Sequence, residues 1–310
     1  MNLTRRGVLA ALAASALALS ACGDSDDALQ GGSGTTDGGT SAAGTITVGS
    51  ANFPENVLLA EMYAGVLEAA GVTVEKELNI GAREVYIPAL QDGSIDLIPE
   101  YNGALLTYFA EGDVEATDSE SVYRELQEAL PEGLTLLEQS EAEDKDTLSV
   151  TAETAERYGL ETIADLAPVA GDLVVGAGPE FRTRRQGLVG LEEVYGVTFG
   201  QFRPLDVGGP LTVGALKDGE VDVANIFSTD SSIETNGFVT LEDPENLFLA
   251  ENVVPVISSD KVTPEVEEAL NGLSAALTTE KLTTELAKVQ VDKQPAEQVA
   301  QEFLEAEGLL

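Results

Sequence analysis

The stretch GSIDLIPEYNGALLTYF at residues 93–109 places polar and aromatic side chains directly after an apolar run. The run at residues 95–98 predicts a buried strand, and we expect Pro99 to end its hydrogen bonding because proline has no N–H to donate. Glu100 and Tyr101 follow at once. A tyrosine ring attracts cations to its face, and a carboxylate beside it could instead transfer protons in catalysis. The sequence therefore predicts a site where this strand ends.

The residue types that are missing narrow the chemistry of that site. The chain has no histidine, and Cys22 is its single cysteine. Ser-His-Asp catalysis, Cys-His catalysis and histidine metal sites are therefore excluded. We expect no catalytic residues, no metal and no cofactor. An enzyme that uses Tyr101 with Glu100 or Asp230 for proton transfer is kept as an alternative, as is a ligand sensor that acts on a separate signalling partner.

Two copies of one pattern run through the chain. The segment ALQDGSID at residues 89–96 recurs as ALKDGEVD at residues 215–222. Upstream, TITVG corresponds to DLVVG, and GVTV corresponds to GVTF. Aromatic residues follow these segments in both copies, namely Phe53 and Tyr101 in the first and Phe181 and Phe227 in the second. The matching order indicates a duplicated structural unit.

Each copy alternates short apolar, β-branched runs with helical patterns, which predicts an α/β fold with parallel-rich sheets. Strand–helix–strand units build such sheets with right-handed crossovers, so two sets of them make two lobes. Ligands bind beyond the carboxyl ends of the strands in an open parallel sheet, where Tyr101 and Phe227 fall. We expect both rings to face a cleft between the lobes, although each could instead only cap its own sheet.

The chain outside this pattern divides into recognisable parts. Residues 1–22 combine two arginines with an apolar run that is too short to span a bilayer but suits an export signal, either Sec or twin-arginine. Residues 23–44 are rich in Gly, Ser, Thr and Asp and predict a flexible tether. We assign residues 45–146 and 251–310 to lobe I and residues 147–250 to lobe II, with crossings near residues 147–151 and 248–257.

Helical patterns return near the C-terminus. Thr263-Pro264-Glu265 predicts a helix start, because proline is favoured in a first turn. The apolar residues at 266, 270, 273 and 277 then share one face. Pro295 predicts the start of a second helix. We expect both helices to pack on lobe I.

Two resemblances add to this interpretation. LSAC at residues 19–22 resembles a bacterial lipobox, which implies cleavage before Cys22 and a lipid anchor on that residue. Residues 46–109 resemble the substrate-binding proteins of ABC importers for glycine betaine, choline and related osmoprotectants. The matching text is VGSANFPEN, NIGAREV and ALQDGSIDLIPEYNGALL, continued by VTAETAERYGLETIADL, GAGPEFRTRRQGLVGLEEVYG and FSTD. The resemblance implies a type II periplasmic-binding-protein fold, whose two lobes close around a small solute.

In that family a cage of tyrosines holds a trimethylammonium group. Tyr101 matches one cage tyrosine, and Phe227 stands in place of another. The remaining cage positions fall near Asp146 and Glu251. No tyrosine follows Tyr195 and the chain has no tryptophan, so a four-tyrosine cage cannot exist here.

The resemblance also suggests further contacts. Arg184 matches an arginine expected on the ligand carboxylate, and Arg83 replaces a threonine. Each arginine could instead form an ion pair with an acidic residue of the chain, and Asp146 and Glu251 could lie on a solvated rim. The full set of expected ligand-binding residues is Asn52, Asn56, Arg83, Tyr101, Asn102, Ala104, Asp146, Arg184, Phe227, Thr229 and Glu251.

Together these features predict a lipid-anchored receptor that captures a quaternary-ammonium or zwitterionic solute, similar to glycine betaine or choline or derived from an amino acid. Its expected partners are the solute, an ABC permease, and the membrane through the lipid on Cys22. The net charge of −39 makes nucleic acid an unfavourable partner. We expect the protein to be a monomer.

Overall fold

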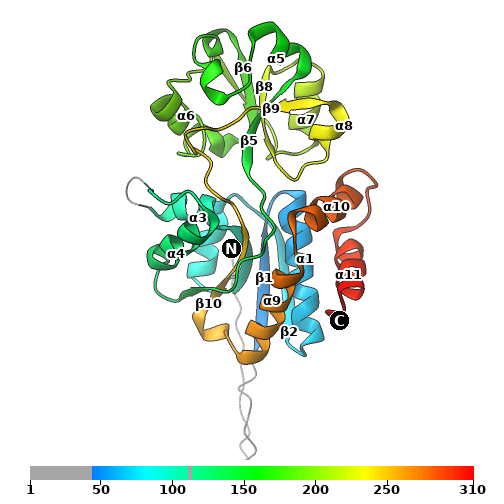
Figure 1. Cartoon of the computed structure of the whole chain (residues 1–310). Coiled ribbons are helices and arrows are strands. Elements are labelled where there is room, and N and C mark those ends of the chain that lie inside the picture. Colours follow the sequence, from blue (N-terminus) through cyan, green and yellow to red (C-terminus); the bar gives the residue numbers. More distant parts are fainter. Residues whose placement is uncertain (1–43, 111–113) are drawn as a thin grey trace, which may run out of the picture. The chain divides into compact units, whose positions relative to one another are not determined.

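The computed structural model describes residues 44–110 and 114–310, which belong to one compact unit (Figure 1). The predicted export signal with Cys22, and the predicted tether up to residue 43, lie outside the described residues. Among the residues that are described, no helix is long and apolar enough to cross a membrane.

Two five-stranded mixed sheets organise the chain and confirm the predicted α/β class. The strand order is β2-β1-β3-β10-β4 in the first sheet and β7-β6-β8-β5-β9 in the second. The first sheet consists of β1 (Thr45–Ala51), β2 (Thr73–Gly81), β3 (Leu97–Tyr101), β4 (Leu134–Leu136) and β10 (Val253–Ser258). The second consists of β5 (Asp146–Thr151), β6 (Val174–Ala177), β7 (Gln201–Pro204), β8 (Val223–Phe227) and β9 (Phe238–Thr240). We call these sheets, with the helices packed on them, lobe I and lobe II; the residue bounds given for the lobes above stay a prediction.

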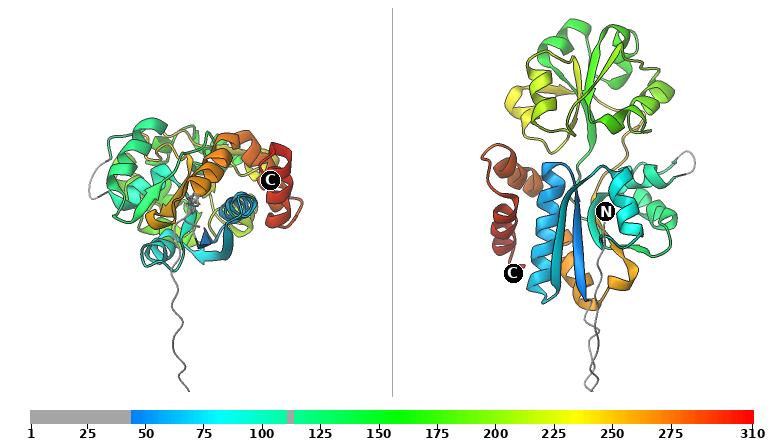
Figure 2. Two further views of the ribbon diagram at one scale, coloured as in Figure 1. Left: turned by 90° about the horizontal axis from the view of Figure 1, so that it is seen from below. Right: turned by 180° about the vertical axis from the view of Figure 1, so that it is seen from behind.

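The predicted duplication extends to the topology of the sheets. In lobe I, β1 pairs in parallel with β2 and β3, and β10 pairs antiparallel with β3 and β4. In lobe II, β6 pairs in parallel with β7 and β8, and β5 pairs antiparallel with β8 and β9. Each sheet therefore takes its fourth strand from the other side of a crossing connection, as Figure 2 also shows.

The glycine of each repeated Asp-Gly turn, and the aspartate three residues after it, have the same structural role in both lobes. Gly93 and Gly219 adopt φ values of 79° and 69°, which side chains disfavour and glycine tolerates. The Asp96 carboxylate then accepts a hydrogen bond from Thr47 N at 2.8 Å, and the Asp222 carboxylate accepts one from Val174 N at 2.8 Å. Each aspartate thus ties the strand that begins after it to its parallel neighbour.

The prediction that Pro99 ends the strand hydrogen bonding is wrong. Strand β3 continues to Tyr101, and Pro99 lies opposite Pro255 of β10. The carbonyl of Pro99 accepts from the Asn56 side chain, and that of Pro255 accepts from Leu137 N, so both carbonyls point away from the facing strand. The two prolines therefore form a non-hydrogen-bonded pair, where an N–H is not required.

Helices cover both faces of the first sheet (Figure 1). One apolar core joins the sheet to α1 (Pro54–Ala69), α9 (Pro264–Ala276), α10 (Thr279–Gln290) and α11 (Ala296–Glu307). A second core lies against α2 (Arg83–Gln91), α3 (Asn102–Phe109) and α4 (Ser119–Ala129). Lobe II has shorter helices, namely α5 (Ala152–Tyr158), α6 (Leu188–Tyr195), α7 (Pro210–Lys217) and α8 (Ser232–Asn236), and 3-10 turns that include Pro179–Arg182.

The C-terminal helices pack on lobe I as predicted. Thr263 caps α9 by accepting a hydrogen bond from Val266 N, and the apolar face of α9 is buried in the same core as Ile46 of β1. Helix α1 packs against this sheet on one side and against α9, α10 and α11 on the other. It is therefore held firmly, and its first turn lies where β1 ends.

Candidate functional site

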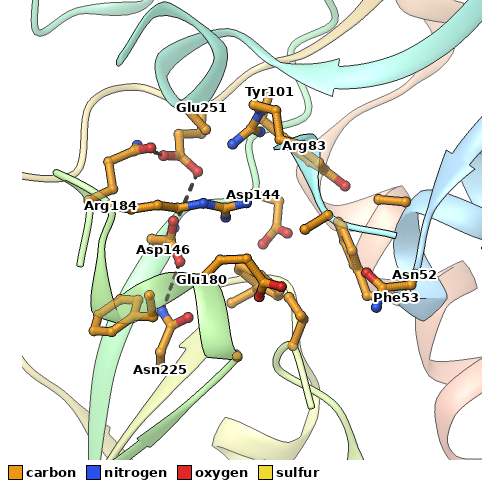
Figure 3. Close-up of a pocket in the computed structure, with 18 of the residues that line it drawn as sticks. Asn52, Phe53, Arg83, Tyr101, Asp144, Asp146, Glu180, Arg184, Asn225 and Glu251 are labelled. Carbon is orange, nitrogen blue, oxygen red and sulfur yellow. Dashed lines mark hydrogen bonds between the residues drawn. The ribbon is translucent and has the colours of Figure 1, made fainter. Parts of the chain in front are cut away.

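A cavity that is partly open to solvent lies where parallel strands of both sheets end (Figure 3). Lobe I contributes residues that follow β1 and β2 and the last residue of β3. Lobe II contributes residues that follow β6 and β7 and the end of β8. The location agrees with the general position of ligand sites in open parallel sheets.

Many of the predicted site residues line this cavity. They are Asn52, Arg83, Tyr101, Ala104, Asp146, Arg184, Phe227 and Glu251. Residues that line it but were not predicted include Phe53, Tyr86, Asp144, Glu180, Phe181, Gln186 and Asn225. The duplication offered a signal for the two phenylalanines, because they occupy matching positions in the two copies. The others have no such counterpart in the sequence pattern.

Aromatic rings from both lobes meet at one side of the cavity. The ring of Phe53 in lobe I lies 5.3 Å from that of Phe227 in lobe II and 6.0 Å from that of Tyr101, measured between centroids. Phe181 and Tyr86 add two further buried rings to the lining. The rings of Tyr101 and Phe227 therefore share one hollow and do not merely cap their sheets.

Arg83 is held by a buried ion pair. Its Nε and Nη2 atoms donate to the two carboxylate oxygens of Glu100, both at 2.8 Å, and the Tyr86 hydroxyl donates to Glu100 Oε1 at 2.7 Å. Burial opposes the charge on Arg83, but Glu100, Tyr86 and Glu251 together outweigh it and raise the pKa of the guanidinium. Glu100 lies near the end of β3, where it neutralises the charge of Arg83. Arg83 therefore forms an ion pair within the chain, which is the alternative to a ligand contact given above.

Arg184 forms the corresponding pair across the two lobes. Its Nε and Nη2 atoms donate to the Glu84 carboxylate at 2.9 and 2.8 Å. The hydrogen bond from Arg184 lowers the pKa of Glu84, although burial acts in the opposite direction. The two side chains are 29% and 44% exposed, so this pair is much more solvated than that of Arg83.

Two acidic side chains lie across the cavity from Phe53 (Figure 3), of which Glu251 is buried and Asp146 is half-buried. Asn225 Nδ2 donates to Asp146 Oδ1 at 2.8 Å, and Gln186 Nε2 donates to Glu251 Oε1 at 2.6 Å. Glu251 is 2% exposed, and burial, followed by the charge of Asp146, raises its pKa. Burial also raises the pKa of Asp146. Both groups therefore gain from any cation that enters beside them.

A second acidic pair lies behind the aromatic rings. The Thr229 hydroxyl contacts carboxylate oxygens of both Glu55 and Asp144, and the Tyr101 hydroxyl donates to Glu55 at 2.8 Å. Burial and then the charge of Glu55 raise the pKa of Asp144, and burial raises that of Glu55. A hydroxyl has one proton to donate, so a carboxyl proton completes this set of contacts. Thr229 does not line the cavity, and its hydroxyl is used in these contacts.

Asn56 and Asn102 are also outside the lining residues, and their side chains are used within the protein. Asn56 accepts a hydrogen bond from Ala51 N and donates to the Pro99 carbonyl, which joins the ends of β1 and β3. Asn102 accepts one from Asn252 N at 2.8 Å, which fixes the start of α3 against the chain entering β10. Both are buried, and both position the cavity wall without facing the cavity.

No group of three or more acidic, histidine or cysteine side chains within residues 44–110 and 114–310 has the arrangement of a metal site. The described residues instead form a two-lobed solute-binding protein, in which aromatic rings and carboxylates from both lobes line one cavity. The chain belongs to the family described as the substrate binding domain of ABC-type glycine betaine transport systems, which matches residues 44–306. Members of this family are extracytoplasmic proteins that bind small solutes and work with an ABC permease; they are not enzymes.

Known proteins similar to this chain include the glycine betaine-binding protein YehZ of Escherichia coli K12, which is 27% identical over 86% of this chain and 92% of its own length. The carnitine transport binding protein OpuCC of Listeria monocytogenes is 26% identical over 86% of this chain and 88% of its own. A solved structure described as a glycine betaine/carnitine/choline ABC transporter superposes with a TM-score of 0.67 at 24% identity, covering 85% of this chain and 99% of the other. The last likeness supports the type II periplasmic-binding-protein fold.

Proposed function

We propose that this protein is a receptor outside the cytoplasm that captures a small quaternary-ammonium or zwitterionic solute between its lobes and delivers it to an ABC permease. The observation that carries the proposal is the aromatic group formed by Phe53, Tyr101 and Phe227. Its members come from both lobes and line one cavity. Aromatic faces attract a desolvated cation by about 2 kcal/mol or more.

The same group explains how binding would favour closure. Phe227 belongs to lobe II, while Phe53 and Tyr101 belong to lobe I. A ligand between them contacts both lobes only when they are together, and it therefore shifts the population toward the closed state. A closed receptor is the form that a permease would recognise.

We further propose that the lipid on Cys22 anchors the protein to the outer face of the cell membrane and that the tether at residues 23–44 gives the receptor reach. The support is the LSAC sequence at residues 19–22 and the composition of the segment after it. We propose that the receptor acts as a monomer, since each chain contributes both sides of the cavity.

A ligand screen tests the proposed function. Glycine betaine, choline, carnitine and amino-acid-derived zwitterions are added singly in a thermal-shift assay, and each compound that raises Tm is then measured by calorimetry. We expect at least one compound to bind reversibly at micromolar Kd, without being converted. Absence of binding below millimolar concentration across the panel would refute the proposed function.

A further inference from the structure

The cavity contains more carboxyl groups than its arginines can neutralise. The carboxyl groups in its lining belong to Asp144, Asp146, Glu180 and Glu251. The two arginines in the lining each make a two-bonded ion pair with a different glutamate, so their charges are already shared. The charges of Arg184 and Arg83 act to lower the pKa of Asp146, but burial outweighs them and the pKa is raised. A ligand cation would favour the charged forms of Asp144, Asp146 and Glu251, whereas a ligand carboxylate would oppose them.

The uncharged hydrogen-bond donors of the lining are mostly used within the protein, whereas the two guanidinium groups keep N–H groups beyond their ion pairs. The side-chain N–H groups of Asn225 and Gln186 are directed to Asp146 and Glu251. Both tyrosine hydroxyls of the cavity donate to glutamates as well. Within residues 44–110 and 114–310, no side chain donates to the second oxygen of Asp146 or to the amide oxygen of Asn225. These acceptors are therefore available to donors of a ligand.

The acceptors lie across the cavity from Phe53 (Figure 3), while Phe227 is the cross-strand partner of Asp146 and extends from the same side as the acceptors. Figure 3 shows Asp146, Glu251 and Asn225 on the side opposite Asn52 and Phe53. A ligand that satisfies both sides has two ends, one that is apolar or methylated and one that donates hydrogen bonds. A trimethylammonium group suits the rings, but it has no N–H and cannot satisfy the acceptors.

We propose that the solute carries a primary ammonium or guanidinium group, bound by Asp146 and Asn225 beside Glu251, and has no free carboxylate. The proposal rests on the proposed function and specifies the solute class of the same site. An N–H-bearing cation both offsets the carboxyl charge and makes charge-assisted hydrogen bonds, which are about twice as strong as neutral ones. Such a ligand leaves both arginine pairs intact, whereas a ligand carboxylate would have to share a guanidinium with Glu84 or Glu100.

A matched series of three probes tests this inference by calorimetry at low salt. Glycine betaine, choline and 2-aminoethyl-trimethylammonium share the same methylated head and differ only in a carboxylate, hydroxyl or ammonium at the other end. We expect the ammonium probe to bind at least about tenfold more tightly than choline, and glycine betaine to bind most weakly. Equal binding of the three probes, or preference for glycine betaine, would overturn the proposal.

Asp146→Asn tests whether Asp146 causes the preference for the ammonium probe over choline. The variant keeps an oxygen for Asn225 but removes the charge, so the preference for the ammonium probe over choline should fall at least about tenfold while choline binding changes little. Glu128→Gln on the exposed face of α4 removes a distant carboxylate and should leave all three affinities unchanged. An equal loss for all three probes in Asp146→Asn would mean that the residue only shapes the cavity, and the assignment would fail.

The outcomes separate this inference from the proposed function. If none of the three probes binds, the inference is overturned, yet a hit elsewhere in the ligand screen would leave the receptor function standing. If no compound in either experiment binds, both fail together.

Discussion

Glu100→Gln is predicted to destabilise the protein strongly because it leaves the buried guanidinium of Arg83 without a counter-charge. Arg83 is 7% exposed and Glu100 is fully buried, and the pair is joined by two hydrogen bonds of 2.8 Å. Removing one partner of a buried pair costs about 3–5 kcal/mol. Glutamine keeps one acceptor oxygen, so we expect a loss near the lower end, about 3 kcal/mol.

Glu84→Gln is the matched control for this change. It also replaces a glutamate that accepts two hydrogen bonds from an arginine, but the side chains of Arg184 and Glu84 are 29% and 44% exposed. Solvated pairs contribute about 0–1 kcal/mol. Urea unfolding followed by circular dichroism should therefore separate the two variants by about 2 kcal/mol or more. Equal midpoints for both variants would refute the reasoning that burial sets the value of these pairs.

Three further changes test other parts of the molecule. Tyr101→Ala should weaken binding of a quaternary-ammonium probe by about 1–2 kcal/mol in calorimetry, and an unchanged Kd would remove this ring from the site. Affinity for a cationic probe should rise with pH and keep rising above pH 5, where ordinary carboxyls with pKa of about 4 are already ionised. The reason is that burial raises the pKa of Asp144 and Glu251 and a cation favours their charged forms; a flat profile would contradict this. Cys22→Ala should move the protein from the membrane to the soluble fraction, and unaltered fractionation would exclude the lipid anchor.

The duplicated pattern was sufficient to predict the architecture. ALQDGSID and ALKDGEVD mark the same turn and strand start in each lobe, because both need a glycine at positive φ and an aspartate that ties two parallel strands. The aromatic residues after them therefore fall at equivalent strand ends. The position of the cavity follows from this equivalence and from a general property of parallel sheets.

The partners of the charged residues could not be predicted in the same way. Arg83 begins α2 and Glu100 lies in the next element, β3, but the sequence pattern does not indicate that these two side chains face one another. Pro99 was misjudged because its effect depends on which residue of the neighbouring strand lies opposite. Asp144 was missed because it lies in a connection between sheets, where no periodicity or repeat indicates its orientation.

The equal strand order of the two sheets has a consequence for how an asymmetrical molecule is oriented. Because the two sheets that line the cavity have equivalent strand orders, the order of the strands does not by itself favour one orientation of a bound solute over the other. The orientation of a bound solute therefore depends on the side chains that line the cavity, such as Tyr101 in one half and Asp146, Asn225 and Phe227 in the other.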